Sequence, residues 1–299
     1  MLAQERSPGS SPWTMERRRM PPAYSIVTTC KGRLQHLQRS LPTFLSQPDA
    51  EVVVVDYDCP QGTGNWVQAH FPAARVERVS HAPIFNLSRA RNIGARAARA
   101  PWLVFCDADN VLSDAFTPAL AAYLAPNVFV RPYRETEQGA IAVPFPLACE
   151  AGVYWAVGGF DDAIEGWGAE DWEFVERLLR HGVVQRVFPV SLVSILDHDD
   201  SARTRFYEDA MQVSRLISHY YAQIKARYSD TRGRQFTDAQ RYAVYRQVKD
   251  AVHAALGEPA PEALFDVTVP DATPPWIARL RAAEARAIHA RISGTPATG

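Results

Sequence analysis

Residues 102–109 read WLVFCDAD, and this stretch decides how the chain is expected to fold. Trp102–Cys106 is an uninterrupted apolar run, which is typical of a strand buried on both faces of a sheet. Glu51–Tyr57 (EVVVVDY) has the same character, and Tyr24–Cys30 (YSIVTTC) is rich in strand-forming residues. Helical patterns near 32–45 and over 86–100 lie between these runs. Strands that alternate with helices predict an α/β fold with a mainly parallel sheet.

The second half of this pattern predicts further elements of both kinds. Thr117-Pro118 is expected to begin a helix, with Thr117 as the cap and the proline in the first turn. A helix is expected over Glu170–His181, and a strand over Val184–Leu196. We predict that the α/β domain spans residues 23–202.

Both ends of the chain differ from this pattern. Residues 1–22 are rich in Ser, Pro and Arg and are predicted to form a disordered tail. In the last hundred residues, apolar side chains recur at helical spacing over 206–224, 238–256 and 275–291, with a proline-rich link at 258–274. We therefore predict an α-helical C-terminal extension over residues 203–299.

The composition argues against several classes of protein. The net charge of −1 gives no basic field that would attract nucleic acid or an acidic membrane. No apolar run approaches the roughly 20 residues that a transmembrane helix needs, and the N-terminus has no apolar signal segment. Four widely spaced cysteines, at positions 30, 59, 106 and 149, are predicted to be free thiols. We expect a cytoplasmic protein whose oligomeric state is open.

Two aspartates, in the sequence DAD, follow the predicted strand Trp102–Cys106. In open α/β sheets, ligands bind at the carboxyl ends of parallel strands. Asp107 and Asp109 can there hold a hard divalent cation, Mg²⁺ or Mn²⁺, together with water and substrate phosphates. Aspartates are also common at strand ends because they favour turns, so the triplet alone leaves a structural role open.

The segment 157–179, VGGFDDAIEGWGAEDWEFVERLL, carries a second group of candidates. Trp167 lies between two glycines, where an indole is hard to bury and can stack on a sugar face. Glu170 and Asp171 begin the next helix. Acidic residues are favoured in a first helical turn by the helix dipole, which is the alternative reason for their presence.

A third group lies at the end of the next apolar strand, in the sequence LDHDD at 196–200. His198 is surrounded by carboxylates there, and a neutral imidazole is a good third ligand for a Mn²⁺-like ion. Arg203 and Arg205 follow and are placed to reach a diphosphate. A lone histidine is more often structural, so this assignment depends on the aspartate pair.

The loops after the first two strands supply the remaining candidates. Asp56 ends the second strand and can accept a hydrogen bond from the N3–H of uracil. Lys31 and Arg33, in the sequence TTCKGR after the first strand, can meet phosphate. Ordinary loop polarity explains these residues equally well.

Taken in order, the motifs TTCKGR, VVD, FNLSRARNIG, DAD, GGFDD, GWGAED and DH resemble those of the GT-A glycosyltransferases. They are most similar to the family-2 type and to the β-1,4-galactosyltransferase and chondroitin-polymerase-like branch, over residues 23–205. The chain departs from that pattern at Ala169, where GWGGED has glycine. It departs again at Leu87, because FNRA has arginine directly after asparagine.

The resemblance implies a nucleotide-sugar donor, with a UDP-sugar expected, and an acceptor of unknown kind. It also implies a catalytic base at Asp171, a sugar site shaped by Glu170 and an acceptor site lined by Trp167. A divalent metal, Mn²⁺ or Mg²⁺, is expected on Asp107, Asp109 and His198. The expected donor-binding residues are Thr29, Lys31, Arg33, Asp56, Arg89, Asn92, Asp107, Ala108, Trp167 and Arg203.

The predicted reaction is the transfer of a hexosyl or N-acetylhexosaminyl group with inversion at the anomeric carbon. One alternative is a Mg²⁺-dependent phosphatase of the haloacid-dehalogenase type, because FCDADNV resembles its first motif. That reading requires a downstream lysine, and no lysine occurs between positions 32 and 224. A nucleotide-binding module without catalysis is the other alternative. A sugar nucleotidyltransferase is disfavoured because the first strand is not followed by a GxGxR loop.

Overall fold

The computed structural model describes residues 21–137, 139–197, 205–257, 264–281, 284, 286–288 and 290. The predicted tail at 1–22 therefore lies almost wholly outside the described residues. The first elements are β1 (Tyr24–Cys30), α1 (Leu34–Leu45), β2 (Ala50–Tyr57), α2 (Thr63–His70), β3 (Arg75–Val79), α3 (Leu87–Ala97) and β4 (Trp102–Asp107). These bounds confirm the strand and helix alternation that the sequence predicts.

The next elements complete the α/β part of the chain. They are β5 (Asn110–Leu112), α4 (Phe116–Leu120), β6 (Val128–Thr136), β7 (Gly139–Ala142), β8 (Leu147–Glu150), α5 (Ala151–Ala156), α6 (Glu170–Arg180), β9 (Val184–Pro189), the 3₁₀ turn η1 (Val190–Leu192) and β10 (Val193–Ile195). The predicted strand over 184–196 is thus two strands joined by a turn. The cap of α4 is Ala115 rather than the predicted Thr117, whose side chain turns instead to Gln47 and the Pro48 carbonyl.

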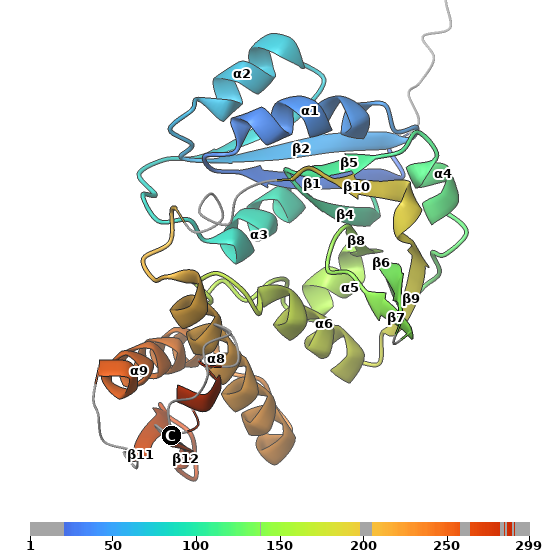
Figure 1. The fold of residues 1–299 in the computed structure, drawn as a ribbon. Coiled ribbons are helices and arrows are strands. Elements are labelled where there is room, and N and C mark those ends of the chain that lie inside the picture. The colour runs from blue at the N-terminus through green and yellow to red at the C-terminus, as the bar shows by residue number, and fades with distance from the viewer. Residues whose placement is uncertain are drawn as a thin grey trace, which may run out of the picture.

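The central sheet has the strand order β3-β2-β1-β4-β8-β6-β7, and β9 pairs with β6. The strands β3, β2, β1 and β4 are parallel, whereas β8 runs antiparallel to β4 and β6 antiparallel to β8. Figure 1 shows α1 and α2 on one face of the sheet and α3 on the other. The fold is therefore the predicted α/β fold with a mainly parallel sheet.

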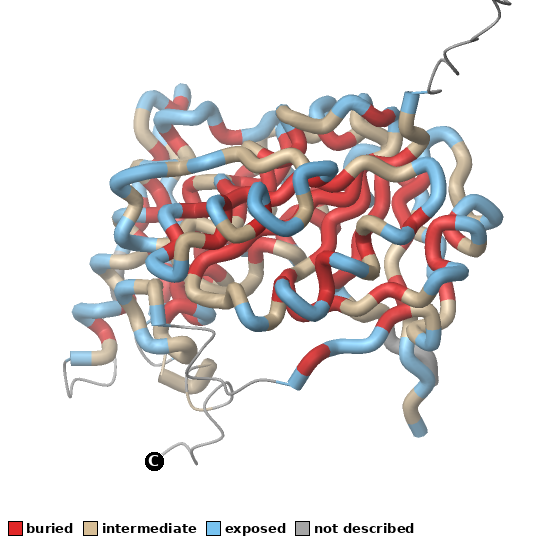
Figure 2. Tube along the Cα trace, turned by 90° about the horizontal axis from the view of Figure 1, so that it is seen from above, coloured by how far each residue is buried: buried red, intermediate tan, exposed pale blue. Residues whose placement is uncertain are grey.

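The apolar runs are buried because helices cover the sheet on both faces. Alternate residues of β2 face opposite sides of the sheet: Val52 and Val54 pack with α1, whereas Val53 and Val55 face α3. Gly94 lets α3 lie close to the sheet, since a Cβ at this position would overlap the side chain of Val27. Buried segments accordingly run through the middle of the molecule in Figure 2.

The C-terminal part contains α8 (Met211–Arg232), α9 (Asp238–Gly257), β11 (Leu264–Val269) and β12 (Trp276–Arg281). The helices confirm most of the predicted extension, but the helix predicted over 275–291 is wrong at its start. Residues 276–281 form a strand that pairs antiparallel with β11, which itself lies in the predicted proline-rich link. Phe206, expected in the first of these helices, lies in the loop before α8.

The C-terminal helices share a core with the α/β part. Ala163 and Ile164, from the loop before α6, are buried among side chains of α8 and α9. The division of the chain at 202/203 stays a prediction. None of the helices in the described ranges combines the length and the hydropathy that a bilayer span requires.

Candidate active site

The candidate active site lies where the strand order reverses. The chain leaves β1 toward β2 on one side and later returns to β4 on the other, so the carboxyl ends of β1 and β4 are adjacent. Thr29 and Asp107 are paired in register at this edge. Such switch points are the ligand-binding edges of open α/β sheets. A cavity of about 470 Å³ opens there, within the usual range for small-molecule sites.

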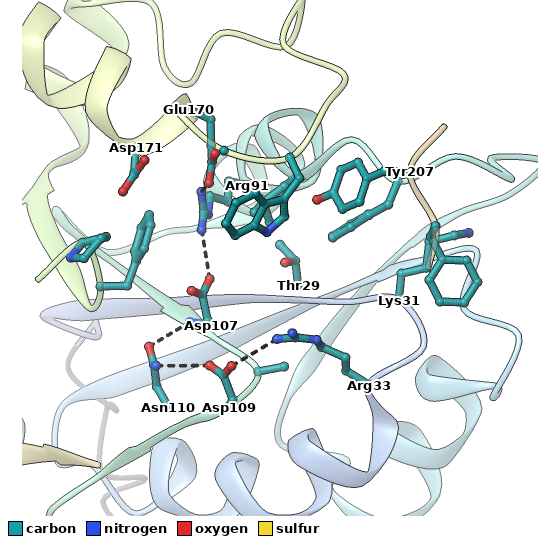
Figure 3. Close-up of a pocket in the computed structure, with 18 of the residues that line it drawn as sticks. Thr29, Lys31, Arg33, Arg91, Asp107, Asp109, Asn110, Glu170, Asp171 and Tyr207 are labelled. Carbon is teal, nitrogen blue, oxygen red and sulfur yellow. Dashed lines mark hydrogen bonds and ion pairs between the residues drawn. The ribbon is translucent and has the colours of Figure 1, made fainter. Parts of the chain in front are cut away.

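The structure brings most of the predicted site residues to this cavity (Figure 3). The predicted residues that line it are Thr29, Lys31, Arg33, Asp107, Ala108, Asp109, Trp167, Glu170 and Asp171. They come from the ends of β1 and β4 and from the start of α6, which are far apart in the sequence. The fold therefore gathers the DAD and GWGAED motifs around one space.

The two aspartates of the DAD motif have different partners. Asp107 accepts a hydrogen bond from Arg91, 2.9 Å away, and its carboxylate faces the cavity. Asp109 is more deeply buried and is paired with Arg33 at 3.1 Å. Asn110 braces the turn, because its side chain accepts from the Asp107 amide at 2.9 Å and donates to Asp109. Figure 3 shows the two carboxylates directed toward these different arginines.

Burial disfavours the ionised form of Asp107 at this end of β4. Burial raises the pKa of Asp107 above its ordinary value; Arg91 opposes the shift, and the charge of Asp109 adds to it. A raised carboxyl pKa means that the ionised form is disfavoured, which a bound cation would reverse. Two hard carboxylates on a cavity wall also suit Mg²⁺ or Mn²⁺. These residues therefore fit a divalent cation.

A complete metal cluster is not assembled by the described side chains. No three His, Cys, Asp or Glu residues of the described ranges converge on one point. His198 and Arg203, predicted as metal ligand and diphosphate ligand, lie outside the described residues. The aspartate pair is thus the part of the predicted metal site that the structure places.

Arg91 is the main site residue that the sequence reading missed. Its side chain is only 3% exposed and donates to Asp107 at 2.9 Å and to Glu170 at 3.2 Å. Its guanidinium lies 3.9 Å from the ring centroid of Phe145, a distance that suits cation–π stacking. Arg91 therefore connects the DAD turn to the first turn of α6.

Glu170 and Asp171 have different surroundings although they are adjacent. Burial raises the pKa of Glu170 to about 7; Asp171 adds to the rise and Arg91 opposes it. One oxygen of Glu170 is buried without a hydrogen bond. Asp171 also lines the cavity, and no described residue makes a hydrogen bond or ion pair with its carboxylate. Asp171 is therefore the carboxylate available to a substrate.

The loop that carries Trp167 is held by the C-terminal helices. The backbone amide of Trp167 donates to the Ser214 hydroxyl of α8, and that of Gly166 donates to the Tyr245 hydroxyl of α9 at 3.0 Å. Arg215 lies 5.6 Å from the Trp167 ring centroid. The position of the indole in the cavity thus depends on α8 and α9.

Ala169 precedes α6 with a φ of 65°, in the left-handed region that glycine adopts more easily. We expect Ala169→Gly to raise the free energy of unfolding by about 0.5–1 kcal/mol, because it removes a cost of about 1–2 kcal/mol for a non-glycine residue there. Ala226→Gly in the middle of α8 is the matched control and should lower stability by about 1 kcal/mol. Urea unfolding of both variants checks this. If both glycine variants were less stable than the wild type, the backbone at Ala169 would not be strained.

Lys31 lines the cavity but does not supply a free ammonium group. Its three N–H donors are directed to three backbone carbonyls, those of Tyr57, Asp58 and Ala82, at 3.1, 2.9 and 2.7 Å. The phosphate contact of this residue stays a prediction, and it would require Lys31 to leave carbonyls through which it joins two loops. Phe206 packs over it, with 5.1 Å from Nζ to the ring centroid.

Phe206 belongs to a segment that covers this edge of the sheet. Its carbonyl accepts from the Phe85 amide at 2.8 Å, and its ring occupies the space that a Cβ on Gly32 would need. Phe206 and Tyr207 both line the cavity. The segment that leads into α8 is thus a wall of the candidate site.

Three other predicted donor-binding residues do not line the cavity. The two carboxylate oxygens of Asp56 accept hydrogen bonds from the backbone amides of Cys59 and Gly64, and these bonds cap the turn after β2. Asn92 is buried and bonded to Phe160 and Tyr154, which fixes the GGF turn against α3. Arg89 is exposed on α3, whereas Leu87 from the same helix does line the cavity.

Two sequence models of known families match adjacent parts of the chain. The model described as glycosyl transferase family 2 matches residues 25–139, and the one described as the N-terminal domain of galactosyltransferase matches residues 147–227. The mannosyltransferase PcManGT from Pyrobaculum calidifontis, solved with GDP-Man and Mn²⁺, superposes with a TM-score of 0.53 at 15% identity. That superposition covers 81% of this chain and 77% of the other. The chain therefore has the GT-A fold, and over residues 25–139 and 147–227 it is similar to glycosyltransferases.

Further similarities agree with this glycosyltransferase fold. Residues 1–349 of Staphylococcus aureus TarS superpose with a TM-score of 0.51 at 12% identity, over 76% of this chain and 72% of that one. Validoxylamine A glucosyltransferase of Streptomyces hygroscopicus subsp. jinggangensis is 27% identical over 56% of this chain. The chain spans about half of that curated relative, 53% of its length.

Proposed function

We propose that this glycosyltransferase moves a sugar from a UDP-sugar to an acceptor hydroxyl, with inversion and with a divalent cation. The observation that carries the proposal is the single cavity with Asp107 and Asp109 on one wall and Asp171 on another. Solved proteins of the same fold contain GDP-Man with Mn²⁺ or UDP-GlcNAc, which supports a nucleotide-sugar donor. A pocket of about 470 Å³ has room for such a donor.

Each polar group of the cavity has a role in this proposal. Asp107 and Asp109 would hold the cation, which supplies positive charge to offset the charge that develops on the departing diphosphate. Arg33 would leave Asp109 and turn to a phosphate oxygen, since an arginine pairs bidentately with either group. Arg91 orients Asp107 and Glu170 from behind. The cavity thereby fixes the donor relative to α6.

The acceptor would be activated by Asp171. This carboxylate is unpaired among the described residues, so it can accept a hydrogen bond from the acceptor hydroxyl and take its proton during attack. Glu170, whose pKa burial raises to about 7, would bind a sugar hydroxyl beside it. Attack from the face opposite the diphosphate would invert the anomeric carbon, and this requires the cavity to hold acceptor and donor in line.

A thermal-shift screen tests the donor and the cation together. We expect UDP or a UDP-sugar to raise the melting temperature in the presence of Mn²⁺. When the ligand is 100-fold above Kd, the free energy of unfolding should increase by about 2.7 kcal/mol. UDP-glucose, UDP-N-acetylglucosamine, GDP-mannose and dTDP-glucose form the panel. Asp107→Asn should remove the effect of Mn²⁺, because it removes a charged ligand of the cation.

The exposed Asp114, in the loop after β5, provides the control. Asp114→Asn makes the same chemical change outside the cavity and should keep the response to Mn²⁺. A panel in which no nucleotide stabilises the wild-type protein with Mn²⁺ would refute the proposal. Phosphate release from p-nitrophenyl phosphate with Mg²⁺ would instead favour the phosphatase alternative, which the fold and the family matches do not favour.

A further inference from the structure

A second cavity of about 590 Å³ adjoins the first one. Ala169, Asp171 and Arg215 line both cavities, so the proposed base lies on their common boundary. The first cavity extends from this boundary toward the DAD turn, and the second extends along α6 and α8. A molecule in the second cavity can therefore present a group to Asp171 while the first cavity is filled.

The second cavity has an aromatic side chain on its wall. Trp172 follows Asp171 directly and is 43% exposed, which is unusual for so large an apolar residue. Its ring lies 5.9 Å from that of His219, tilted by 37°. An exposed indole next to a carboxylate offers a flat apolar surface beside a hydrogen-bond acceptor, and this combination suits a ring that carries both C–H and O–H groups.

Polar side chains of α8 complete this wall. Gln223 and His219 both line the cavity, one helical turn apart, and their side-chain nitrogens are 2.9 Å from each other. Together with Arg215 they offer amide, imidazole and guanidinium groups. These groups donate and accept hydrogen bonds in several directions, as a molecule with several hydroxyl groups requires.

We propose that the second cavity is the acceptor site, and that its occupant is a polyhydroxylated ring, a sugar or a cyclitol. The ring stacks on Trp172 and directs one hydroxyl to Asp171, and Gln223 and His219 bind its other hydroxyls. This inference rests on the proposed function of the first cavity. It gives the C-terminal helices a role in acceptor recognition, since α8 supplies three of the lining side chains, Arg215, His219 and Gln223.

The lining disfavours two other kinds of acceptor. A lipid-linked acceptor would require a continuous apolar wall, but Ile288 and Ala169 are the aliphatic residues among the described lining. A peptide would require an extended groove with free backbone groups, whereas most of the described lining consists of side chains of two helices, α6 and α8. A volume of about 590 Å³ lies within the usual range for small-molecule sites.

Saturation-transfer NMR on the full chain, with UDP and Mn²⁺ present, tests the proposal without any need for turnover. The ring probes are methyl α-glucopyranoside, methyl β-N-acetylglucosaminide and myo-inositol. The competing probes are the tripeptide Ala-Ser-Ala and octyl phosphate. We expect saturation transfer to at least one ring probe and a loss of roughly tenfold in affinity for it in Trp172→Ala, as one lost aromatic contact predicts. Gln223→Ala should also weaken that probe.

Trp155→Ala is the matched control, because Trp155 is 38% exposed and lines neither cavity. It should bind the ring probe as the wild type does. Equal binding by Trp172→Ala and wild type, or transfer only to the tripeptide or to octyl phosphate, would overturn the proposal. The thermal shift with UDP and Mn²⁺ is measured on the same samples. If it is present while ring binding fails, the acceptor inference is refuted and the donor proposal stands.

Discussion

Asp171→Asn is expected to lower kcat by about 10²–10⁴-fold, the usual contribution of a positioned general base. The asparagine has nearly the same shape but cannot take the acceptor proton. The carboxylate lies on the boundary of the two cavities and has no described partner, so the change breaks no ion pair that supports the fold. The binding of UDP with Mn²⁺ should persist, because Asp107 and Asp109 are untouched. Steady-state transfer rates and the thermal shift measure the two effects.

Glu176→Gln on the same helix is the control for this experiment. Glu176 pairs with Arg180 and lines neither of the two cavities that border Asp171, so its neutralisation should leave kcat within a factor of about two. Unchanged turnover in Asp171→Asn would remove this residue from the role of base. Loss of both turnover and UDP binding would point instead to a structural defect.

Lys225→Met is expected to destabilise the protein by about 3–5 kcal/mol, the usual cost of removing one partner from a buried ion pair. The ammonium group of Lys225 donates to Asp161 at 2.5 Å and to Glu173 at 2.7 Å, and all three residues are buried. Arg241 also pairs with Asp161, at 2.6 Å. Methionine fills the space but leaves the buried carboxylates with less compensation. Urea unfolding measures the loss.

Lys249→Met provides the comparison at a surface pair. Lys249 contacts the exposed Glu208, and such pairs contribute about 0–1 kcal/mol. If both lysine variants lose the same small amount of stability, the ion pairs of Lys225 with Asp161 and Glu173 do not contribute as a buried cluster.

The ion pairs of Asp161 also predict how the stability difference between the wild type and Lys225→Met depends on pH. Burial alone would raise the pKa of Asp161, but Lys225 and Arg241 outweigh it and hold this pKa below its ordinary value. A depressed carboxyl pKa stabilises the fold above the unfolded value and loses that effect as the pH falls through the folded value. The stability gap between wild type and Lys225→Met should therefore be complete at neutral pH and shrink below about pH 4. A gap that widens in acid would contradict this assignment.

The sheet could be predicted from the sequence because its strands are buried on both faces. The apolar side chains of EVVVVDY and WLVFCD alternate between both faces of a strand, so both faces must be covered. Both segments form strands at the expected positions. The β11–β12 hairpin could not be predicted in the same way. In β12 only Ala278 and Leu280 are buried, and their spacing of two residues extends over too few positions to distinguish a strand from a helix. The partner strand and α9 decide its conformation.

The site was predictable where chemistry and position in the fold agree, and less so where a charged side chain has a buried partner. Asp107 and Asp171 were found from strand-end and helix-start patterns. The carbonyl contacts of Lys31 could not be predicted, because a lysine near a phosphate site and a lysine that binds three carbonyls look alike in sequence. Arg91 was missed, although its spacing from Leu87 and Gly94 at i, i+4 and i+7 puts it on the helix face toward the sheet.

The segment 205–207 has a consequence for engineering this enzyme. Phe206 and Tyr207 form part of the wall of the proposed donor cavity, yet they belong to the connection that leads into α8. A chimera that grafts another protein's α8 and α9 after a junction downstream of Tyr207 keeps these two side chains but replaces Arg215 and the contacts that hold the Trp167 loop. A junction upstream of Arg205 replaces the two aromatic side chains as well, so a comparison of the two hybrids separates their contribution to nucleotide preference from that of the helices.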